Sequence, residues 1–410
     1  MRRALKPWLV SVAVLAAASA PPWVGLYGSR GVGDMYLFRL YAHRMDLGLW
    51  PYHGFFFDWP PGSVPPVLAP VWLPGPYYVA FHALVFVYAA LALGALAVAL
   101  VLLRASTRRL YAAVIAAAIV PLALGAISID SIDFWPALFT TAAIAALLAD
   151  RNRLGFGLLG FAFVAKLYPV VIVPVALIWL WRRRGRAEAV RSLVVGIVVA
   201  ALVALPFLLV GPTGLGFSVW SQFKRGLQME SLGASILMAL DHLGVYRAHV
   251  VVGQPYSLDV SGGVARAVGV VSTLVTIVAL LWVYDRYRRG PDEAQRFVTA
   301  AVTSVAAYVA LGRVLSPQYL IWLIPLVPLV SGPAGAAATG LLIAAGGVTM
   351  TWFPGDFWRL AAVGDISWFV LLRDVLLVGV LVLVAHRLRS ESAPSGGPCS
   401  TPCRTTWRRA

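Results

Sequence analysis

The chain of 410 residues is 60% hydrophobic and only 12% charged, and its mean hydropathy is +0.82. An ordinary soluble domain is about 45 to 50% apolar, so the composition excludes one and predicts an all-α, polytopic integral membrane protein. The formal charge of +16 would suit nucleic-acid binding, but Lys and Arg lie in short clusters between apolar runs. Such clusters are typical of cytoplasmic loops, so no nucleic acid is expected among the partners.

The N-terminus resembles a secretory signal, because Arg2, Arg3 and Lys6 precede an apolar run that ends Ala18-Ser19-Ala20. Pro21 would follow the cleavage site, so we interpret the segment as an uncleaved first span. A membrane span requires about 20 apolar residues. The apolar runs fall at 8–27, 77–103, 111–127, 134–149, 155–181, 191–210, 264–284, 297–313, 319–332, 335–351 and 367–386.

The run 155–181 conflicts with a single crossing. With the N-terminus in the cytoplasm, one crossing would place the dense basic cluster 182–186 outside. A hairpin of two half-helices that turns at Lys166-Leu167-Tyr168-Pro169 removes the conflict, because Pro169 disfavours helix at Tyr168. We therefore predict about 12 crossings of the plasma membrane, counting the half-helices separately, with both termini cytoplasmic and Lys166 near the outer face.

One transmembrane domain is expected over residues 1–388, followed by a disordered cytoplasmic tail at 389–410. The extracytoplasmic segments 28–76 and 211–263 are too long for simple connectors, so we expect them to carry the functional site. The first includes a predicted interfacial helix, from Asp34 to Trp50. Cysteine occurs only at Cys399 and Cys403, which excludes a disulfide framework. No metal-ligand spacing is recognisable, and no cofactor is expected.

Two acidic residues of the first long loop are candidate catalytic groups. Asp34 follows Gly33, which lets the backbone turn as the chain leaves the membrane; it is either a general base or a helix cap. Asp58 precedes Trp59-Pro60-Pro61-Gly62, a stiff turn that would hold a carboxylate beside aromatic rings. Its alternative is a capped surface turn.

Three later segments bring polar groups to the same face. Lys166 is a cation between apolar helices, which either faces a cavity or snorkels to the interface. The segment 220–235 contains Arg225, Gln228 and Glu230. These residues form either a polar cluster in the second long loop or the exposed face of an ordinary amphipathic helix. Arg313 and Gln318 flank an external junction, where anchoring of a helix end is the alternative. Asp130 and Asp133 are expected only to cap an external turn, and His82 to be an interfacial histidine.

A carboxylate loop together with the cations Lys166, Arg225 and Arg313 suits a transfer from a lipid phosphate. A carboxylate can deprotonate an acceptor hydroxyl, and cations stabilise the charge that grows on a departing phosphate. The alternative from another class is a transporter or flippase of lipid-linked sugars, but transporters typically show paired halves with broken helices at the midplane. A non-catalytic scaffold for envelope assembly is a second alternative.

At these residues the chain resembles the polyprenol-phosphate-mannose-dependent mannosyltransferases of glycosyltransferase family 87, actinobacterial membrane enzymes of the C-type glycosyltransferase fold. The resemblance implies an inverting enzyme of cell-envelope biosynthesis that transfers mannose from a β-linked polyprenyl phosphate on the extracytoplasmic side, without metal. The segments that carry it are Gly33-Asp34 with Tyr41, Gly48-Leu49-Trp50-Pro51-Tyr52, Asp58-Trp59-Pro60-Pro61-Gly62, Lys166-Leu167-Tyr168-Pro169, Arg225-Gly226-Leu227-Gln228-Met229-Glu230-Ser231 and Ser316-Pro317-Gln318-Tyr319-Leu320-Ile321-Trp322.

The resemblance also implies roles for single residues. Asp34 is the expected base, and Asp58 a second, acceptor-side carboxylate, although the family commonly has Glu-Tyr-Pro-Pro-Gly in place of Asp58-Trp59-Pro60-Pro61-Gly62. The expected hexosyltransferase takes a polyprenyl-phosphate sugar as donor and a lipid-linked mannoside or glycan as acceptor. The sequence leaves open the acceptor, the linkage and whether the sugar is mannose or a pentose. Expected donor contacts are Lys166, Arg225, Arg313, Gln318 and Tyr168; expected acceptor contacts are Tyr52, Trp59, Gln228 and Glu230.

Overall fold

The structure is a computed structural model, and it describes residues 2–23, 33–253 and 257–390. Several sequence predictions fall wholly or partly on other residues. The end of the first span beyond Trp23, the start of the first long loop and part of the second lie outside the described residues, as does the tail from 391 with both cysteines.

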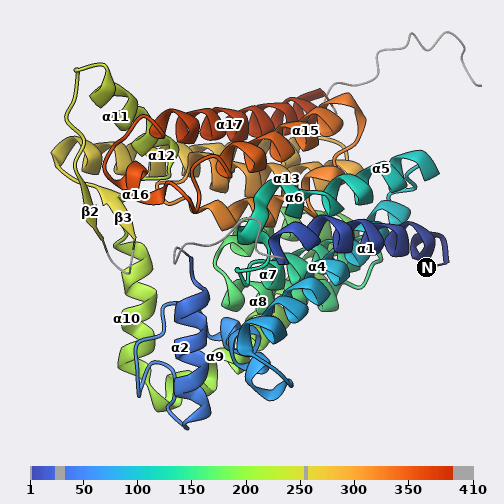
Figure 1. Cartoon of the computed structure of the whole chain (residues 1–410). Helices are drawn as coiled ribbons and strands as arrows, with labels where there is room; N and C mark the ends of the chain where they lie inside the picture. Colours follow the sequence, from blue (N-terminus) through green and yellow to red (C-terminus); the bar gives the residue numbers. More distant parts are fainter. Residues whose placement is uncertain (1, 24–32, 254–256, 391–410) are drawn as a thin grey trace, which may run out of the picture.

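The described chain is mainly helical, as the composition predicts (Figure 1). Its α-helices are α1 (Arg2–Trp23), α2 (Met35–Asp46), α3 (Val64–Leu68), α4 (Tyr77–Leu102), α5 (Thr107–Ala118), α6 (Val120–Leu124), α7 (Phe134–Leu148), α8 (Asn152–Ala165), α9 (Val173–Val210), α10 (Pro212–Phe223), α11 (Leu232–His242), α12 (Gly263–Arg289), α13 (Ala294–Leu311), α14 (Leu320–Leu323), α15 (Gly332–Thr349), α16 (Phe357–Ala361) and α17 (Ser367–Ser390). Short 3-10 helices are η1 (Pro61–Ser63), η2 (Ala69–Trp72), η3 (Gly125–Ser128), η4 (Tyr168–Ile172), η5 (Pro317–Tyr319) and η6 (Val327–Leu329).

The second long loop contains a small antiparallel sheet, which the all-α prediction did not include. Its strands are β1 (Leu227–Gln228), β2 (Val250–Val252) and β3 (Leu258–Val260), in the order β1-β3-β2. Leu227 pairs with Val260, and Gln228 with Asp259. Glu230 follows the end of β1 by two residues, so the sheet helps to set its position.

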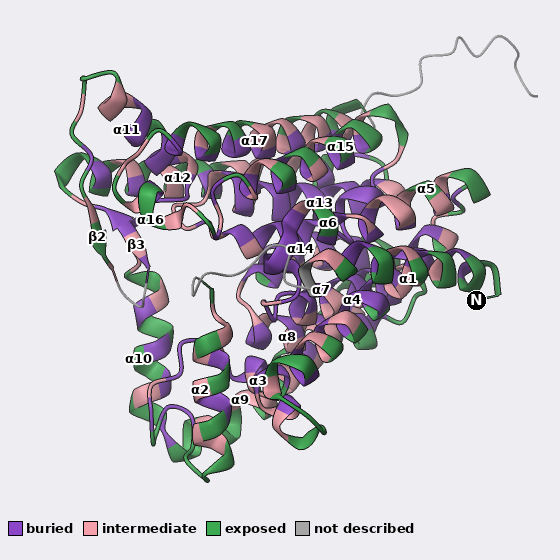
Figure 2. Cartoon of the chain, viewed as in Figure 1, coloured by how far each residue is buried: buried purple, intermediate pink, exposed green. Residues whose placement is uncertain are grey.

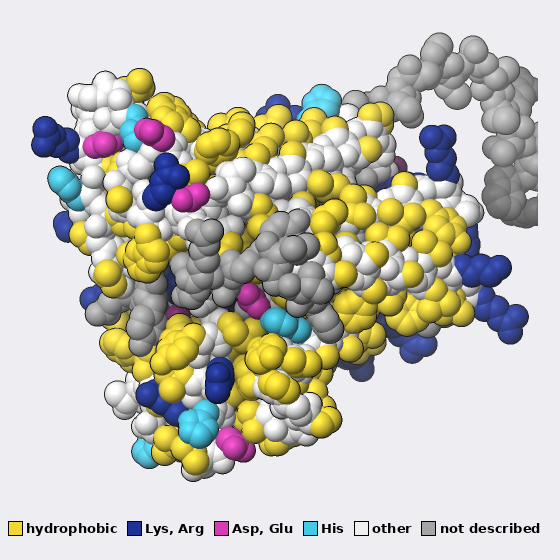
Figure 3. All heavy atoms as spheres, in the orientation of Figure 1, with side chains coloured by type: hydrophobic (Ala, Val, Ile, Leu, Met, Phe, Trp, Pro, Cys, Tyr) yellow, Lys and Arg dark blue, Asp and Glu magenta, His cyan; other side chains and the backbone are white. Residues whose placement is uncertain are grey.

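Eight helical segments among the described residues are long and apolar enough to cross a membrane, so this is a multi-pass membrane protein. The long helices also expose apolar side chains outward. On α9, Leu202 and Leu209 are 63% and 73% exposed, and on α12 Val278 is 65% exposed. Figure 3 shows such side chains covering the bundle in broad areas. Soluble proteins rarely expose contiguous apolar surface of this extent, whereas lipid would cover it. The segments are Arg2–Pro21, Tyr77–Leu102, Thr107–Ser128, Tyr168–Val210, Gly263–Arg289, Ala294–Leu311, Gly332–Thr349 and Ser367–Ser390.

The chain turns where the sequence predicts a turn, between α8 and α9. Helix α8 ends at Ala165, Lys166 is extended, and η4 begins at Tyr168 with Pro169 in its first turn. Helix α9 is itself interrupted at Gly185, whose φ of +80° lies outside the helical region. The segment 166–184 therefore runs back from the turn as a separate helical arm.

The second part of α9 then runs parallel to α8. Near the start of both, Arg153 Nε lies 3.0 Å from Glu188 Oε1. Farther along, the helices touch through glycines: a Cβ on Gly160 would lie only 2.1 Å from the carbonyl oxygen of Gly196. Because α8 and the second part of α9 begin at the same end, the segment 166–184 between them must run back to that end. Helix α8 and this segment therefore form the predicted hairpin.

Gly160→Ala is expected to destabilise the protein, because the added methyl group would push α8 away from α9. Overpacking of this kind typically costs about 1 to 3 kcal/mol, although alanine favours helix over glycine by about 1 kcal/mol. The matched control is Gly340→Ala in α15, where an added Cβ meets nothing within 4 Å. Thermal unfolding in detergent should show a lower Tm for Gly160→Ala and an unchanged or higher Tm for Gly340→Ala. Equal Tm values would contradict the close helix contact.

Basic turns gather at one end of the bundle. The basic cluster 182–186, around the kink in α9, pairs with the turn before α8, through Arg184 Nη2 and Asp150 Oδ1 at 3.2 Å. It also pairs with the turn before α13, through Arg183 Nε and Asp292 Oδ2 at 3.0 Å. Arg109 at the start of α5 donates to the carbonyl of Leu329 at 2.6 Å. The charge pattern predicts that these basic clusters share one side of the membrane. The ion pairs join the turns that carry them at one end of the bundle.

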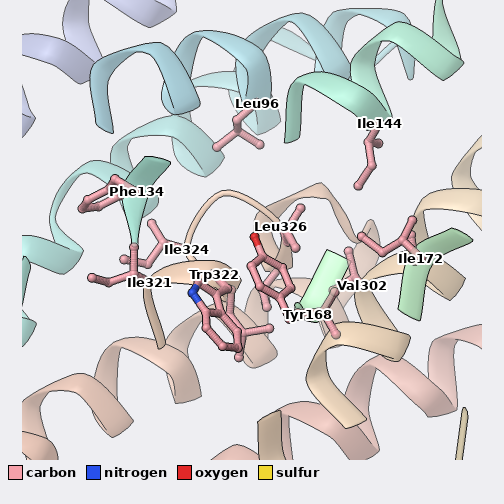
Figure 4. Packing of buried hydrophobic residues seen from close by; sticks show 14 of the residues in the cluster. Leu96, Phe134, Ile144, Tyr168, Ile172, Val302, Ile321, Trp322, Ile324 and Leu326 are labelled. Carbon is pink, nitrogen blue, oxygen red and sulfur yellow. The ribbon is translucent and has the colours of Figure 1, made fainter. Parts of the chain in front are cut away.

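The opposite end carries the long loops, including α2, α10, α11, α16 and the sheet (Figure 1). Buried residues concentrate between the two ends, around α7, α8, α13 and α14 (Figure 2). Tyr168 and Trp322 stack there with ring centroids 4.2 Å apart and planes inclined by 8° (Figure 4). A second apolar cluster, which includes Met229, Trp352 and Leu360, joins the second long loop to the segment between α15 and α17.

Candidate active site

Lys166 lies in a charged cluster at the loop-bearing end of the bundle. Its ammonium is 3.3 Å from Asp133 Oδ1 and lies over the rings of Tyr319 and Trp322. Asp133 is buried, and it also accepts hydrogen bonds from Ser131 Oγ at 2.5 Å and Trp322 Nε1 at 2.6 Å. The lysine therefore faces a buried partner rather than snorkelling to the surface. Asp133, expected only to cap a turn, is that partner.

Asp58 is buried beside Arg225, which comes from the loop after α10. Asp58 Oδ2 lies 3.5 Å from Arg225 Nη2, and Oδ1 accepts a hydrogen bond of 3.0 Å from Gln222 Nε2. The turn that holds Asp58 packs directly on the Lys166 turn, because a Cβ on Gly62 would lie 2.8 Å from the backbone of Val164 and Ala165. The structure thus brings the predicted acid and the two predicted cations to one place.

Asp34 immediately precedes α2, but its side chain makes no capping hydrogen bond. Its Oδ2 instead accepts from Gln318 Nε2 at 3.3 Å, from a segment 284 residues farther along the chain. This contact favours a functional role over the helix-cap alternative, because a capping side chain would bond to the backbone of its own helix.

Asp34 lies between two kinds of cavity. A chamber of about 290 Å³, called here the acidic chamber, is lined by Asp34, Asp130 and Glu230, with no Lys, Arg or His among its described lining residues. Two smaller spaces of about 90 and 70 Å³, called here the cationic cavities, share Lys166, Arg225 and Asp58 in their linings. Asp34 lines the acidic chamber and the larger cationic cavity, as do Gln228, Ser316 and Gln318. One carboxylate therefore borders both a space lined by Lys166 and Arg225 and a space whose described charged residues are all acidic.

Burial changes the acidity of both aspartates. It raises the pKa of Asp34 to about 6, against the opposing effect of Lys166. It raises the pKa of Asp58 to about 6 as well, although Arg225, Lys166 and the hydrogen bond from Gln222 oppose the shift. A carboxylate with a pKa near 6 is a stronger base than an ordinary one and still ionised at neutral pH, which suits general-base catalysis.

Gln228 and Glu230 form a pair on the wall of the acidic chamber. Gln228 Nε2 donates to Glu230 Oε2 at 2.8 Å and to Ser316 Oγ at 2.9 Å. The backbone of the pair is anchored too, because Gln228 N donates to the carbonyl of Arg313 and Arg373 Nη2 donates to the carbonyl of Glu230. The two side chains are thus held in place before any ligand binds.

The other predicted residues lie at different depths. Tyr168 and Trp59 line a cationic cavity, and Trp59 also packs against Phe38. Tyr52 is buried behind the site, where its hydroxyl donates to the carbonyl of Trp59 at 2.5 Å, and it lines none of these cavities. Arg313 likewise lines none of them, and it donates to the carbonyl of Phe223 at 2.6 Å. These placements suit support of the site rather than the substrate contacts expected for Tyr52 and Arg313.

Sequence reasoning missed part of the chamber wall. Asp130 lines the chamber and pairs with His82, with Oδ1 2.8 Å from Nε2. The segment between α15 and α17 adds Phe353, Phe357 and Trp358. Its aromatic residues between two apolar runs were the available signal. Among the described residues, no group of three or more His, Cys, Asp or Glu is arranged to hold a metal ion.

The sequence model of glycosyltransferase family 87 matches residues 56–317, well over half of the chain. The chain belongs to glycosyltransferase family 87. It is therefore a membrane glycosyltransferase, as the motif resemblance predicts. The matched stretch includes Asp58, Lys166, Arg225 and Glu230. Asp34 lies before it, so the case for a functional role of Asp34 rests on its position beside the cavities.

Among solved structures, the chain is similar to "ArnT from Cupriavidus metallidurans bound to Undecaprenyl phosphate", with a TM-score of 0.47 and 13% sequence identity. The alignment covers 92% of this chain and 77% of that one. No curated protein matches the sequence.

Proposed function

We propose that this membrane glycosyltransferase is an inverting enzyme that moves a mannosyl residue from a polyprenyl-phosphate sugar to a hydroxyl of a lipid-linked or glycan acceptor. The observation that supports it most directly is the position of Asp34, which borders both the cationic cavities and the acidic chamber. In this proposal the donor phosphate lies by Lys166 and Arg225, and the acceptor lies in the acidic chamber.

The cations favour the products of this reaction. A donor phosphodiester carries one negative charge, and the departing phosphate monoester carries about 1.5 to 2. Lys166 and Arg225 therefore attract the leaving group more strongly than the donor, which is the condition for lowering the barrier. The ring stack of Tyr168 on Trp322 forms part of the wall beside them.

Asp34 would act as the general base. It accepts the proton of the acceptor hydroxyl while that oxygen forms a bond to C1 of the sugar and the bond from C1 to the phosphate oxygen breaks. Attack from the acidic chamber comes from the side away from the phosphate, so the configuration at C1 inverts. Asp58 would hold Arg225 in place, since its carboxylate pairs with the guanidinium near the phosphate position and is itself held by a hydrogen bond from Gln222.

We further propose that the fold is of the C-type, with about 12 crossings of the plasma membrane and cytoplasmic termini. The passages are α1, α4, α5 with α6, α7, α8, the two parts of α9, α12, α13, the segment 317–329, α15 and α17. The gathered Arg clusters support a cytoplasmic location for their end, by the positive-inside rule. The site at the other end would then be extracytoplasmic. A polyprenyl-phosphate sugar can serve as the donor on that side without any nucleotide sugar.

A transfer assay tests the function. The full chain in nanodiscs should consume radiolabelled polyprenyl-phosphate mannose when a lipid-linked mannoside is added, and release polyprenyl phosphate in equal amount. Polyprenyl-phosphate arabinose, assayed in parallel, identifies the donor sugar. Movement of intact donor across sealed vesicles, with no cleavage, would instead show a flippase and overturn the proposal.

A further inference from the structure

A further cavity, called here the α5–α15 cavity, lies between these two helices at the basic end of the bundle. Its volume is about 220 Å³. It shares no described lining residue with the acidic chamber or with the cationic cavities. Helices α5 and α15 lie on the side of the bundle away from the sheet (Figure 1). The cavity is therefore separate from the proposed transfer site.

The walls of the α5–α15 cavity are mostly small and apolar. Ala112 and Ala116 line it from α5, and Gly335 and Ala336 line it from α15. Ala112 and Ala336 are also exposed, so the cavity opens on the outside of the bundle, which lipid surrounds. A pocket that encloses a whole small molecule usually measures about 300 to 1,000 Å³. This smaller space suits one part of a larger molecule, whose remainder lies in the bilayer.

Arg109 is the one charged residue among the described lining residues of the cavity, and it is partly buried. Its Nη2 donates to the carbonyl of Leu329 at 2.6 Å, and both Nη atoms lie 3.5 Å from Gln295 Oε1. These acceptors are neutral, and no ion pair among the described residues includes Arg109. The acids at this end that pair with other arginines are Asp150, Glu188, Asp285 and Asp292. A charge removed from water without a counter-charge is costly, so an anion in the cavity would stabilise Arg109.

A second guanidinium group borders the same cavity. Gly332 lines the cavity, and a Cβ on it would lie 4.0 Å from the guanidinium carbon of Arg387. Arg387 comes from α17, and its Nη2 donates to Ser331 Oγ at 3.3 Å. No Asp or Glu is among the described residues that line the cavity. The cavity therefore combines apolar walls with positive charge at the end where α5 and α15 begin.

We propose that the α5–α15 cavity binds an anionic membrane phospholipid, with its phosphate at Arg109 and the start of one acyl chain between the small residues of the two helices. A guanidinium group binds phosphate through paired hydrogen bonds, and basic pockets between transmembrane helices bind anionic lipid headgroups. A free anion would account for the arginine but not for the apolar walls, and a neutral lipid would account only for the walls. The proposal does not depend on the transfer reaction.

Thermal unfolding of the full-length protein in a neutral detergent tests the proposal, because a ligand that binds the folded protein raises its Tm. The probe is dioctanoyl phosphatidylglycerol, which should raise Tm in a saturable way. Dioctanoyl phosphatidylcholine, which carries no net charge, should bind about 10-fold more weakly, and inorganic phosphate at the same concentration should leave Tm unchanged. An equal rise with either of these two controls would overturn the proposal.

Arg109→Gln tests the phosphate contact. It should weaken the binding of phosphatidylglycerol about 10- to 100-fold, because it removes a hydrogen bond between two charged groups. The matched control is Arg108→Gln, since Arg108 is exposed and does not line the cavity. Its substitution should change the affinity less than about twofold. Equal losses in the two variants would show a general effect of basic charge and overturn the contact with Arg109.

Ala336→Leu tests the position of the acyl chain and keeps Arg109, in case Arg109→Gln folds poorly. The larger side chain would occupy the space between the helices and exclude a few methylene groups of the lipid, which should weaken binding about 10-fold. The matched control is Ala337→Leu, at an exposed position that does not line the cavity. Native affinity for phosphatidylglycerol in Ala336→Leu would overturn the proposal.

Lys166→Met separates the α5–α15 cavity from the cationic cavities, which also attract phosphate. Lys166 lines a cavity at the other end of the bundle. The affinity of Lys166→Met for phosphatidylglycerol, measured from the rise in Tm above its own lipid-free value, should stay within about twofold of the native affinity. Loss of this response in Lys166→Met, together with its retention in Arg109→Gln, would assign the lipid to the cationic cavities and overturn the proposal.

Discussion

Replacing Asp34 with asparagine should lower kcat for glycosyl transfer by about 10²- to 10⁴-fold and leave donor affinity within about twofold. The amide has nearly the same shape, and its oxygen can still accept from Gln318, but it cannot take a proton from the acceptor. General bases typically contribute this factor. Single-turnover transfer measures the rate, and binding of undecaprenyl phosphate measures donor affinity.

The dependence of the rate on pH gives a second measure of the same group. Because burial raises the pKa of Asp34 to about 6, the carboxylate that acts as base is protonated below that pH and ionised above it. The rate should therefore rise tenfold per pH unit below about pH 6 and level off above it. Asp58 titrates in the same range, but Asp58→Asn should keep this limb, whereas Asp34→Asn should lose it.

The matched control for Asp34→Asn is Asp285→Asn at the basic end. Asp285 is partly exposed and pairs with Arg288 and Arg289 on its own helix, and surface pairs of this kind contribute about 0 to 1 kcal/mol. Its substitution should leave transfer unchanged. Turnover by Asp34→Asn at the native rate would remove Asp34 from the role of base.

The sequence predicted the parts of this architecture that follow from local rules. Charge in short loops separates the two ends of the bundle, and Pro169 after a buried lysine marks the turn between α8 and η4. The order of the short motifs along the chain indicated that Asp58, Lys166 and Arg225 belong to one site. The turn follows from residues next to it, whereas the grouping of the site follows from several short motifs matched in order.

Contacts between segments that are distant in the sequence could not be predicted from local rules. Asp133 was interpreted as a cap because nothing near it in the chain shows that Lys166 faces it across a turn. The segment of α16 received no role from its sequence, because only the fold brings Phe357 and Trp358 to the same chamber as Glu230. Tyr52 shows the reverse case: a motif places it near the site, but packing turns its hydroxyl toward the carbonyl of Trp59.

Replacing Lys166 with methionine should weaken the binding of undecaprenyl phosphate by about 10- to 100-fold. Methionine keeps the length and apolar character of the side chain while removing the charge. A hydrogen bond to a charged group typically contributes about 1.5 to 3 kcal/mol, and Arg225 would remain as the other cation of the cavity. Titration of the lipid phosphate into protein in nanodiscs measures the change.

Lys224→Met is the matched control, because Lys224 is next to Arg225 in sequence but its ammonium lies over Trp220 and lines neither cationic cavity. Its substitution should change lipid-phosphate affinity less than about twofold. Equal losses in the two variants would indicate a general effect of basic charge at this face rather than a contact with Lys166.

Loss of Lys166 also leaves Asp133 buried without its cation, and breaking a buried pair can cost about 3 to 5 kcal/mol of stability. The double variant Lys166→Met with Asp133→Asn separates the two effects, because Asn keeps an oxygen that can accept from Trp322 and an amide that can donate to Ser131, while removing the isolated charge. We expect the double variant to recover the Tm lost by Lys166→Met and still bind undecaprenyl phosphate weakly. Recovery of affinity together with Tm would show that the ammonium supports the fold and does not contact the phosphate.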